Sequence, residues 1–233
     1  MSNILVILAG GQSKRLKIRV PKPYLTINNK PLIQYSIDVG KSVKVINKIV
    51  VVYNNNHRKL LAKHNFKNII KIKGGKSRAE STFNALKRIK KFNCRNILIH
   101  DAARPNISSN IINKIIKELK KNIAVIPAIK ITDSIKLIKN GKTTTNINRN
   151  KLRITQTPQG FKFSELYELN KNHFDKTITD DVSLFINHKK KIKFINGDEN
   201  NIKITTKKDF LTFKKSKLQK TYSGIGFDIH RLE

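Results

Sequence analysis

The amino-acid sequence predicts an α/β protein with a mostly parallel, twisted sheet and helices on both of its faces. Short apolar runs alternate with helix-like segments along the first half of the chain, as expected for repeated strand–helix–strand units. Two of these runs are followed by paired glycines, Gly10-Gly11 and Gly74-Gly75, and a third ends at Asp101. Because the carboxyl ends of parallel strands meet at one edge of a sheet, these segments predict a ligand site at that edge.

The strand and helix candidates of the first half follow one another in order. The apolar runs predict strands at residues 4–8, 48–53, 69–72, 96–100 and 124–129. The segments between them predict helices at residues 32–41, 58–64, 79–90 and 109–120. In the last helix, apolar residues recur every three or four positions after the cap candidates Ser-Ser-Asn, which is typical of a helix that faces the core. These apolar residues are Ile111, Ile112, Ile115, Ile116 and Leu119.

The pattern changes after residue 130. Polar and apolar residues alternate through residues 131–150 around Asn140-Gly141, a dipeptide typical of the tight turn in a β-hairpin. This hairpin is too polar for the centre of a sheet, so we expect a protruding arm that lies on another surface. Beyond the arm, the sequence predicts helices at 164–172, from Asp180 or Asp181 onward and at 207–217, and strands at 191–195 and 202–204.

Composition limits the class of protein. The 233 residues, of which 38% are hydrophobic, suffice for one α/β domain, or for one domain and the start of another. We find no apolar run long enough to span a membrane and no signal-peptide pattern. The single cysteine, Cys94, cannot form an internal disulfide, which suits a reducing compartment. We therefore expect a cytoplasmic protein.

The net charge is +34, from 49 lysine and arginine residues against 15 aspartate and glutamate residues. A charge of this size suggests nucleic-acid binding. Lysine is nevertheless spread over the whole chain, without the basic tail or the basic stripe interleaved with aromatic residues that single-strand binders use. We therefore expect solvated lysine faces, not a nucleic-acid interface, and a field that attracts polyanions such as nucleotides.

The first candidate site follows the first predicted strand, in the stretch LAGGQSKRLKIRVPKPYL. Gly10 and Gly11 let backbone N–H groups approach an anion closely, and the cations Lys14, Arg15 and Lys22 follow in the same loop. This arrangement predicts a phosphate cradle, although its spacing matches neither the P-loop nor the dinucleotide-binding fingerprint. A glycine-rich turn with solvated lysines is the alternative interpretation.

Two further segments are expected to border the same crevice. In IKGGKSRAES, Gly74-Gly75 follow a strand and precede a helix, where a nucleobase could fit, although Ser77 or Ser81 could simply cap that helix. In ILIHDAARPNIS, Asp101 ends a buried strand, where its carboxylate can hold Mg²⁺ against a triphosphate. A helix cap is the alternative role for this aspartate. Together the three loops predict a site for a magnesium nucleotide.

Motifs along most of the chain resemble those of the 2-C-methyl-D-erythritol 4-phosphate cytidylyltransferase family, which acts in non-mevalonate isoprenoid biosynthesis. They are LAGGQSKRL with PKPYL, GGKSRAES, HDAARP, TQTPQGF, ITDD and NIKIT, within about residues 3–218. HDAARP and GGKSRAES are the most specific of them. The resemblance implies a Rossmann-like nucleotidyltransferase fold and a homodimer joined by the hairpin arm. It also implies transfer of CMP from CTP to 2-C-methyl-D-erythritol 4-phosphate, with release of pyrophosphate.

The resemblance further implies roles for the residues of the first loop. The backbone amides of Ala9, Gly10 and Gly11 would wrap the triphosphate of CTP. Arg15 and Lys22 would neutralise the charge that develops on the α-phosphate and on the leaving pyrophosphate. The catalytic cations of this family would therefore lie in this loop.

The later motifs are implied to bind the rest of the nucleotide. Gly75 and Ser81 would read cytosine, and Asp101 would hold Mg²⁺. Lys203 would reach a phosphate as a further catalytic cation, while Arg104 would support the loop around Asp101.

The second substrate is implied to bind beside the nucleotide. Thr157 and Thr179 would line the sugar-phosphate pocket together with Asp101. Arg149 and Ser134, both in the hairpin arm, would contact the substrate phosphate across the dimer interface. Serine at position 134 departs from the threonine expected in this family, but it keeps the hydroxyl group.

Three alternatives stay open. The nearest is a cytidylyltransferase for another polyol phosphate such as ribitol 5-phosphate, which shares the glycine loops and the Asp-Ala-Ala-Arg motif. A basic nucleic-acid-binding protein is more distant, and an inactive nucleotide-binding scaffold is disfavoured because every expected charged position is filled. His57, His64, His173 and His188 show no paired metal-ligand spacing, so we expect solvated side chains there.

The sequence closes with GIGFDIHRLE, residues 224–233, after a polar stretch whose residues 219–223 predict a linker. This segment resembles the first strand of 2-C-methyl-D-erythritol 2,4-cyclodiphosphate synthase, which some bacteria fuse to the cytidylyltransferase. The resemblance implies that Asp228 and His230 are two of three protein ligands of a divalent metal such as Zn²⁺. We therefore expect a cytidylyltransferase domain over residues 1–218, followed by the stump of a second domain with an incomplete metal site.

Overall fold

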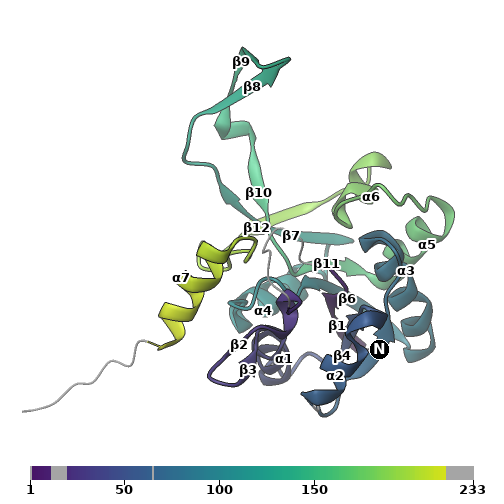
Figure 1. Cartoon of the computed structure of the whole chain (residues 1–233). Helices are drawn as coiled ribbons and strands as arrows, with labels where there is room; N and C mark the ends of the chain where they lie inside the picture. The colour runs from purple at the N-terminus through teal and green to yellow at the C-terminus, as the bar shows by residue number, and fades with distance from the viewer. Residues whose placement is uncertain (1, 12–19, 65, 219–233) are drawn as a thin grey trace, which may run out of the picture.

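The computed structural model of this protein describes residues 2–11, 20–64 and 66–218. An eight-stranded sheet crosses the body, in the order β10-β7-β11-β6-β1-β4-β5 with β12 also paired to β7 (Figure 1). Its strands are β1 (Ser2–Ala9), β4 (Lys48–Tyr53), β5 (Ile70–Lys73), β6 (Cys94–Asp101), β7 (Ala124–Lys130), β10 (Arg153–Thr155), β11 (Gln159–Lys162) and β12 (Lys193–Asn196). All neighbours pair in parallel except β10 and β11, which run antiparallel to theirs. The predicted mostly parallel sheet is confirmed.

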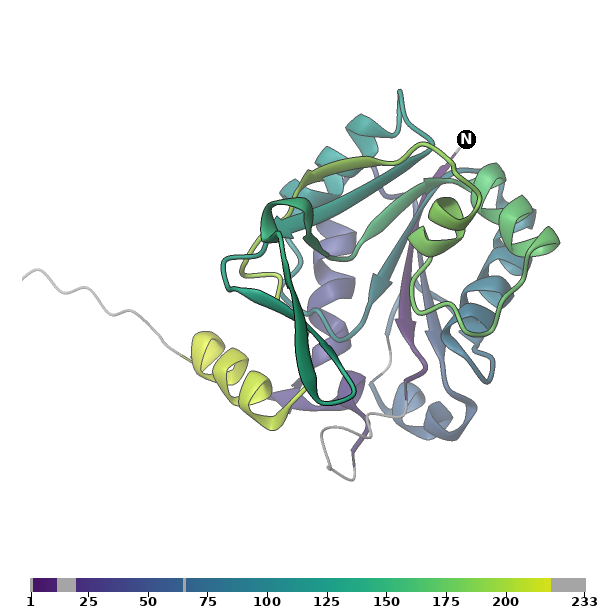
Figure 2. The same ribbon diagram turned by 90° about the horizontal axis from the view of Figure 1, so that it is seen from above.

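Helices cover both faces of this sheet, as Figure 2 shows. They are α1 (Leu32–Ser42), α2 (Arg58–Lys63), α3 (Arg78–Ile89), α4 (Ser109–Glu118), α5 (Phe163–Asn172), α6 (Val182–Asn187) and α7 (Lys207–Leu218). Successive strand residues point to opposite faces. Leu5 and Ile7 of β1 therefore pack in the core with α1, α2 and α4, whereas Ile4 and Val6 pack in the core with α3, α5 and α6. No described helix is long and apolar enough to cross a membrane.

Helix α4 illustrates how local sequence directs packing. Ser108 is its N-cap, and its Oγ accepts a hydrogen bond of 3.4 Å from the N–H of Ile111. The five apolar residues of the predicted stripe are all buried; they are Ile111, Ile112, Ile115, Ile116 and Leu119. The prediction of a core-facing helix is confirmed, with an end two residues earlier than expected.

Short elements complete the body. They are β2 (Thr26–Ile27), β3 (Lys30–Pro31) and the 3-10 turns η2 (Lys22–Tyr24), η3 (Asn55–His57), η4 (Lys90–Phe92) and η5 (Arg149–Lys151). The β2–β3 hairpin adds Leu25 and Ile27 to a small core with Ile204 and Phe213. This small core attaches α7 to the body.

The predicted strand at 202–204 is wrong, because this described segment forms no ladder with any strand. The N–H of Ile204 donates to the carbonyl of Ala103 at 2.8 Å, while Ile204 itself is fully buried. The alternation that suggested a strand is nevertheless real. It buries Ile204 and directs the ammonium group of Lys203 to Asp101, at 2.6 Å from Oδ2.

The predicted hairpin over 131–150 is confirmed as an arm that projects from the body (Figure 1). Its antiparallel strands are β8 (Ile135–Lys139) and β9 (Lys142–Ile147). Between them, Asn140 and Gly141 have φ angles of 52° and 74°. Two consecutive left-handed residues form the turn that matches the twist of a hairpin, which explains the Asn-Gly dipeptide.

Candidate functional site

A cavity of about 910 Å³ lies at the carboxyl edge of the sheet, where β1, β5 and β6 end. Segments that are far apart in sequence contribute to its wall. Of the residues that the sequence predicted for a site, those that line it are Gly10, Gly11, Lys22, Gly75, Ser81, Asp101 and Lys203. The structure thus brings both glycine loops, two lysines and the aspartate to one place.

Hydrogen bonds shape the second glycine loop. The N–H of Gly75 donates to Oγ of Ser81 at 3.0 Å, and the Ser81 hydroxyl donates to the carbonyl of Ser77 at 2.8 Å. Oγ of Ser77 accepts from the N–H of Glu80 at 3.0 Å and so caps α3. One serine caps the helix and the other closes the loop, and both were cap candidates in the sequence.

Close packing explains why this loop contains paired glycines. A Cβ atom on Gly75 would lie 2.2 Å from Cγ of Glu80. A Cβ atom on Gly74 would lie 2.9 Å from Oγ of Ser81 and 3.2 Å from the carbonyl oxygen of Tyr53. Any larger side chain at position 75 must therefore displace Glu80 and the loop that lines the cavity.

Asp101 presents an ionised carboxylate at the end of β6. Its Oδ2 lies 2.6 Å from Nζ of Lys203, and its Oδ1 lies 3.7 Å from Nε of Arg78. Burial raises the pKa of Asp101, but the charges of Arg78 and then Lys203 outweigh it and lower that pKa to about 2. The carboxylate is therefore charged at neutral pH, with Lys203 and Arg78 as its cationic partners in this structure.

A buried network supports Asp101 from behind. The N–H of Asp101 donates to Oγ1 of Thr157 at 3.1 Å, and that hydroxyl lies 3.1 Å from Nδ1 of His100. Nε2 of His100 lies 3.1 Å from the carbonyl of Arg104, which can only accept, so the proton is on Nε2 and Nδ1 accepts from Thr157. Burial lowers the pKa of His100 to about 4. A neutral imidazole therefore holds the loop.

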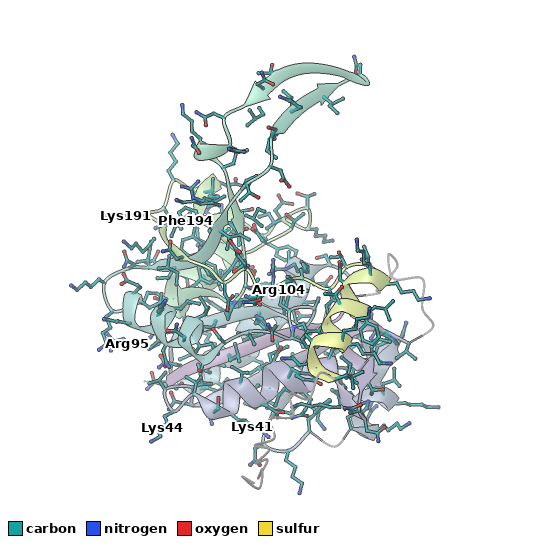
Figure 3. The ribbon with its side chains drawn as sticks, turned by 90° about the vertical axis from the view of Figure 1, so that its left-hand side faces the viewer. Lys41, Lys44, Arg95, Arg104, Lys191 and Phe194 are labelled. Atoms are coloured by element: carbon teal, nitrogen blue, oxygen red, sulfur yellow. The ribbon has the colours of Figure 1, made fainter. Side chains whose placement is uncertain are left out.

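Arg104 lies inside the body (Figure 3) and joins three segments. Its guanidinium donates to the carbonyl of Asn201 at 2.6 Å and to that of Thr155 at 3.4 Å. The side-chain amide of Asn201 in turn donates to the carbonyl of Thr157 at 2.9 Å. This supporting position matches the role that the resemblance implied for Arg104.

The sequence alone assigned no role to Arg78, which lies in the cavity wall. One of its terminal nitrogens lies 2.8 Å from Oδ2 of Asp181, whose side chain is only 3% exposed. Arg78 is also the first residue of α3. A cation in the first turn of a helix interacts unfavourably with the helix dipole. In the sequence, this unfavourable position was the one indication that Arg78 needs carboxylate partners.

Two buried glutamines of the TQTPQGF motif were also missed. Gln156 accepts from the N–H of Asp198 at 3.0 Å and donates to the carbonyl of the same residue at 2.8 Å. Gln159 accepts from the N–H of Val182 at 3.3 Å, at the start of α6. Both side chains hydrogen-bond to the backbone of loops near the carboxyl edge. In the sequence they stand in a polar motif around a proline, which does not indicate that they are buried or which loops they contact.

Other predicted residues lie apart from the described cavity wall. Ser134 and Arg149 are exposed in and beside the arm, where the Arg149 guanidinium donates to the carbonyl of Thr132. Thr179 is exposed ahead of α6, and Thr157 lies behind Asp101. The site for a second substrate is therefore less complete in one chain than the nucleotide site.

Four predicted residues fall outside the described part of the chain, namely Lys14, Arg15, Asp228 and His230. The predicted helix start at Asp180 or Asp181 is confirmed, since α6 begins at Val182 and Oδ1 of Asp180 accepts from the N–H of Ser183 at 3.2 Å.

The donor set around the cavity suits one kind of metal. Among the described residues, no cluster of three or more histidine, cysteine or acidic side chains could hold a metal ion. Mg²⁺ needs no such cluster, because it is commonly bound by one or two carboxylates together with substrate phosphates. Of the acidic residues in the described wall, Asp101 lies at the end of β6, and Mg²⁺ would take the place of the Lys203 ammonium that now lies 2.6 Å from its Oδ2. The residues therefore fit Mg²⁺ carried by a polyphosphate.

The family model described as 2-C-methyl-D-erythritol 4-phosphate cytidylyltransferase (IspD) matches residues 3–215 of this chain. Among curated relatives, the bifunctional enzyme IspD/IspF of Pelagibacter ubique (strain HTCC1062) is 47% identical over 232 residues, covering 100% of this chain and 61% of that relative. The 2-C-methyl-D-erythritol 4-phosphate cytidylyltransferase of Clostridioides difficile (strain 630) is 32% identical over 212 residues, covering 88% of this chain and 89% of that relative. This chain thus spans less than two thirds of the Pelagibacter relative.

A solved structure has a similar fold. The crystal structure of 4-diphosphocytidyl-2C-methyl-D-erythritol synthase from Anaerococcus prevotii DSM 20548 has a TM-score of 0.80 and 27% sequence identity with this chain. The match covers 94% of this chain and 99% of that one. The predicted nucleotidyltransferase fold is confirmed.

Proposed function

Because this chain belongs to the 2-C-methyl-D-erythritol 4-phosphate cytidylyltransferase (IspD) family, we propose that it transfers CMP from CTP to 2-C-methyl-D-erythritol 4-phosphate. The products are 4-diphosphocytidyl-2-C-methyl-D-erythritol and pyrophosphate, and the reaction serves non-mevalonate isoprenoid biosynthesis. The observation that carries the proposal is the cavity at the carboxyl edge, which combines two glycine loops with Lys22, Asp101 and Lys203.

The reaction is an in-line displacement at the α-phosphorus of CTP. An oxygen of the 4-phosphate forms the new bond to this phosphorus while the bond to the bridging oxygen breaks, and pyrophosphate leaves with that electron pair. No covalent enzyme intermediate is required, so catalysis depends on positioning and on electrostatic stabilisation. Lys22, which is 9% exposed in the cavity wall, neutralises charge on the phosphates, together with Arg15 of the same loop.

The other nucleotide contacts come from the two glycine loops and from the end of β6. The amides of Ala9, Gly10 and Gly11 cradle the triphosphate, and Gly75 with Ser81 recognises cytosine. Asp101 would hold Mg²⁺, which would supply positive charge to the triphosphate. Lys203, within 2.6 Å of Asp101, binds phosphate at the same edge.

The second substrate site is proposed to form across a homodimer. Thr157 and Thr179 contribute from one subunit, and Ser134 and Arg149 from the arm of the other. The support is that the arm projects from the body (Figure 1) and carries Ile138 with 63% of its surface exposed, which a second copy can cover.

A pyrophosphate-release assay tests this function. CTP and Mg²⁺ are supplied with either 2-C-methyl-D-erythritol 4-phosphate or ribitol 5-phosphate, and the former is expected to have the higher kcat/KM. Preference for ribitol 5-phosphate would assign the chain to another polyol phosphate. Submicromolar binding to duplex nucleic acid at physiological salt, without any CTP turnover, would instead favour the nucleic-acid interpretation of the +34 charge.

We also propose that residues 224–233 correspond to the start of a cyclodiphosphate synthase domain after a linker at 219–223. The support is that the alignment with the bifunctional enzyme of Pelagibacter ubique extends over 100% of this chain. Asp228 and His230 would then be metal ligands of that domain, which needs a third ligand for a metal such as Zn²⁺. Mass spectrometry of the native gene product tests this: a mass near the 26.7 kDa of this chain would contradict a continuing domain.

A further inference from the structure

Arg78 connects three segments that the proposed reaction must keep in register. It is the first residue of α3, directly after the second glycine loop, and it lies in the cavity wall. Its Nε lies 3.7 Å from Asp101 at the end of β6, and a terminal nitrogen lies 2.8 Å from Asp181 ahead of α6. One planar guanidinium therefore spans two carboxylates, a geometry that a lysine ammonium cannot reproduce.

Asp181 is a rigid anchor for this bridge. Its side chain is 3% exposed, and it lies outside the described wall of the cavity. Its neighbours are held independently, because Asp180 accepts from the N–H of Ser183 and Gln159 accepts from the N–H of Val182. The turn ahead of α6 is thus formed without Arg78, and the Asp181 carboxylate is left to orient the guanidinium.

We propose that Arg78 is a positioning residue that Asp181 holds in place, so that the nucleotide loop and the turn carrying Thr179 keep one fixed separation. The first side of the bridge aligns the loop of Gly75 with Asp101, where CTP and its metal are proposed to bind. The second side aligns the turn with Thr179, where the sugar phosphate is proposed to bind. This inference rests on the proposed function. It states that one ion-pair bridge, through Arg78, sets the positions of both proposed substrate sites.

The decisive variant is Asp181→Asn, because the new side chain has nearly the same volume and position 181 is not itself part of the described cavity wall, which it meets through Arg78. We expect KM to rise about ten-fold for both CTP and the sugar phosphate, since breaking a buried ion pair leaves the Arg78 guanidinium without its main counter-charge. Arg78→Lys should raise both KM values as well, because it reaches only one carboxylate. Glu165→Gln is the matched control, since it removes the ion pair between Glu165 of α5 and Lys190 and should leave both KM values unchanged.

Three results would overturn the inference. Wild-type KM values in Asp181→Asn, with only a lower melting temperature, would mean that the bridge merely stabilises the fold. A raised KM for CTP in Arg78→Lys but not in Asp181→Asn would mean that Arg78 acts on the nucleotide alone. Should Asp181→Asn not fold, wild-type KM values in Arg78→Lys would overturn it equally.

The proposed function can fail separately from this inference. Wild-type protein that does not turn over the sugar phosphate would contradict the function, whereas calorimetric titration with CTP and Mg²⁺ still reports on the bridge. In that titration, Asp181→Asn is expected to bind CTP about ten-fold more weakly than wild type, and Glu165→Gln equally well. Equal CTP affinity in wild type and Asp181→Asn would contradict the bridge regardless of turnover.

Discussion

The carboxyl edge of the sheet and the hairpin arm are both rich in polar residues, yet their side chains are held in different ways. At the edge, His100 and Arg104 are buried and bonded to one another, and Thr157 bonds to both His100 and the backbone of Asp101. In the arm, Ile138 is 63% exposed, although its turn is well defined by Asn140 and Gly141. The difference teaches that one chain preorganises the carboxyl edge by itself, whereas the arm is shaped only by its local turn and, in the proposed dimer, would pack on a second subunit.

The largest effect should follow from a substitution at the edge. Lys22→Ala is expected to lower kcat by about 100-fold or more, because losing a preorganised cation costs roughly 3 to 4 kcal/mol. Steady-state pyrophosphate release measures this. Exposed Lys44, labelled in Figure 3, provides the control, because Lys44→Ala removes a charge beyond α1 and should leave kcat unchanged. Near-normal turnover by Lys22→Ala would mean that Lys22 contributes no more to catalysis than an exposed lysine such as Lys44.

The buried network at the edge should make stability depend on pH. Burial lowers the pKa of His100 from 6.5 to about 4 in the folded protein, so protons bind preferentially to the unfolded chain between these values. The contribution of His100 to the free energy of unfolding is therefore complete above pH 6.5 and falls as pH falls toward about 4. The full span is about 3 kcal/mol.

Urea unfolding of wild type and His100→Gln at pH 7.5 and pH 5 measures this contribution. The variant should be less stable at pH 7.5, because the bonds to Thr157 and Arg104 are disturbed. It should also lose less stability than wild type when the pH is lowered. Parallel pH profiles for the two proteins would show that the edge is not held by a neutral imidazole.

The arm can be tested by mixing two impaired proteins. Arg149→Ala should raise KM for the sugar phosphate by about ten-fold or more, through loss of a charged contact. If the arm serves the partner's site, subunit exchange with Lys22→Ala places one intact site in each mixed dimer. About a quarter of wild-type activity should then return at random exchange, as expected for a two-fold symmetric dimer. Absence of recovery, with mixed dimers verified by native mass spectrometry, would place Arg149 in the site of its own chain.

The smallest effects come from one substitution made in both regions. Gly75→Ala brings a Cβ within 2.2 Å of Glu80 and should raise KM for CTP several-fold by moving the loop. Gly141→Ala, at φ +74°, meets no atom within 4 Å and should strain only the turn, by about 1 kcal/mol. Kinetics and thermal unfolding compare the two. A larger KM change for CTP in Gly141→Ala than in Gly75→Ala would mean that the arm, and not the second glycine loop, governs CTP binding.

Much of the fold could be predicted because its signals are local. The apolar run of β4 predicted Lys48–Tyr53 with the observed bounds, and the spacing of isoleucines in α4 predicted its buried face. The Asn140-Gly141 turn followed from the left-handed backbone that a tight hairpin requires. Periodicity failed at 202–204, since alternation sets which side chains face inward but does not supply a neighbouring strand.

The sequence by itself therefore determined the α/β class, the three loops that meet at the carboxyl edge and the projecting arm, since composition and spacing encode these directly. Only the tertiary structure decided which hydrogen bonds and ion pairs hold those loops in place. Strand β11 lies antiparallel between β6 and β7. Arg78 forms an ion pair with Asp181, which is far from it in the sequence. Such pairings depend on which distant segments folding brings within a few ångströms of each other, and charge or polarity at one position does not specify its partner.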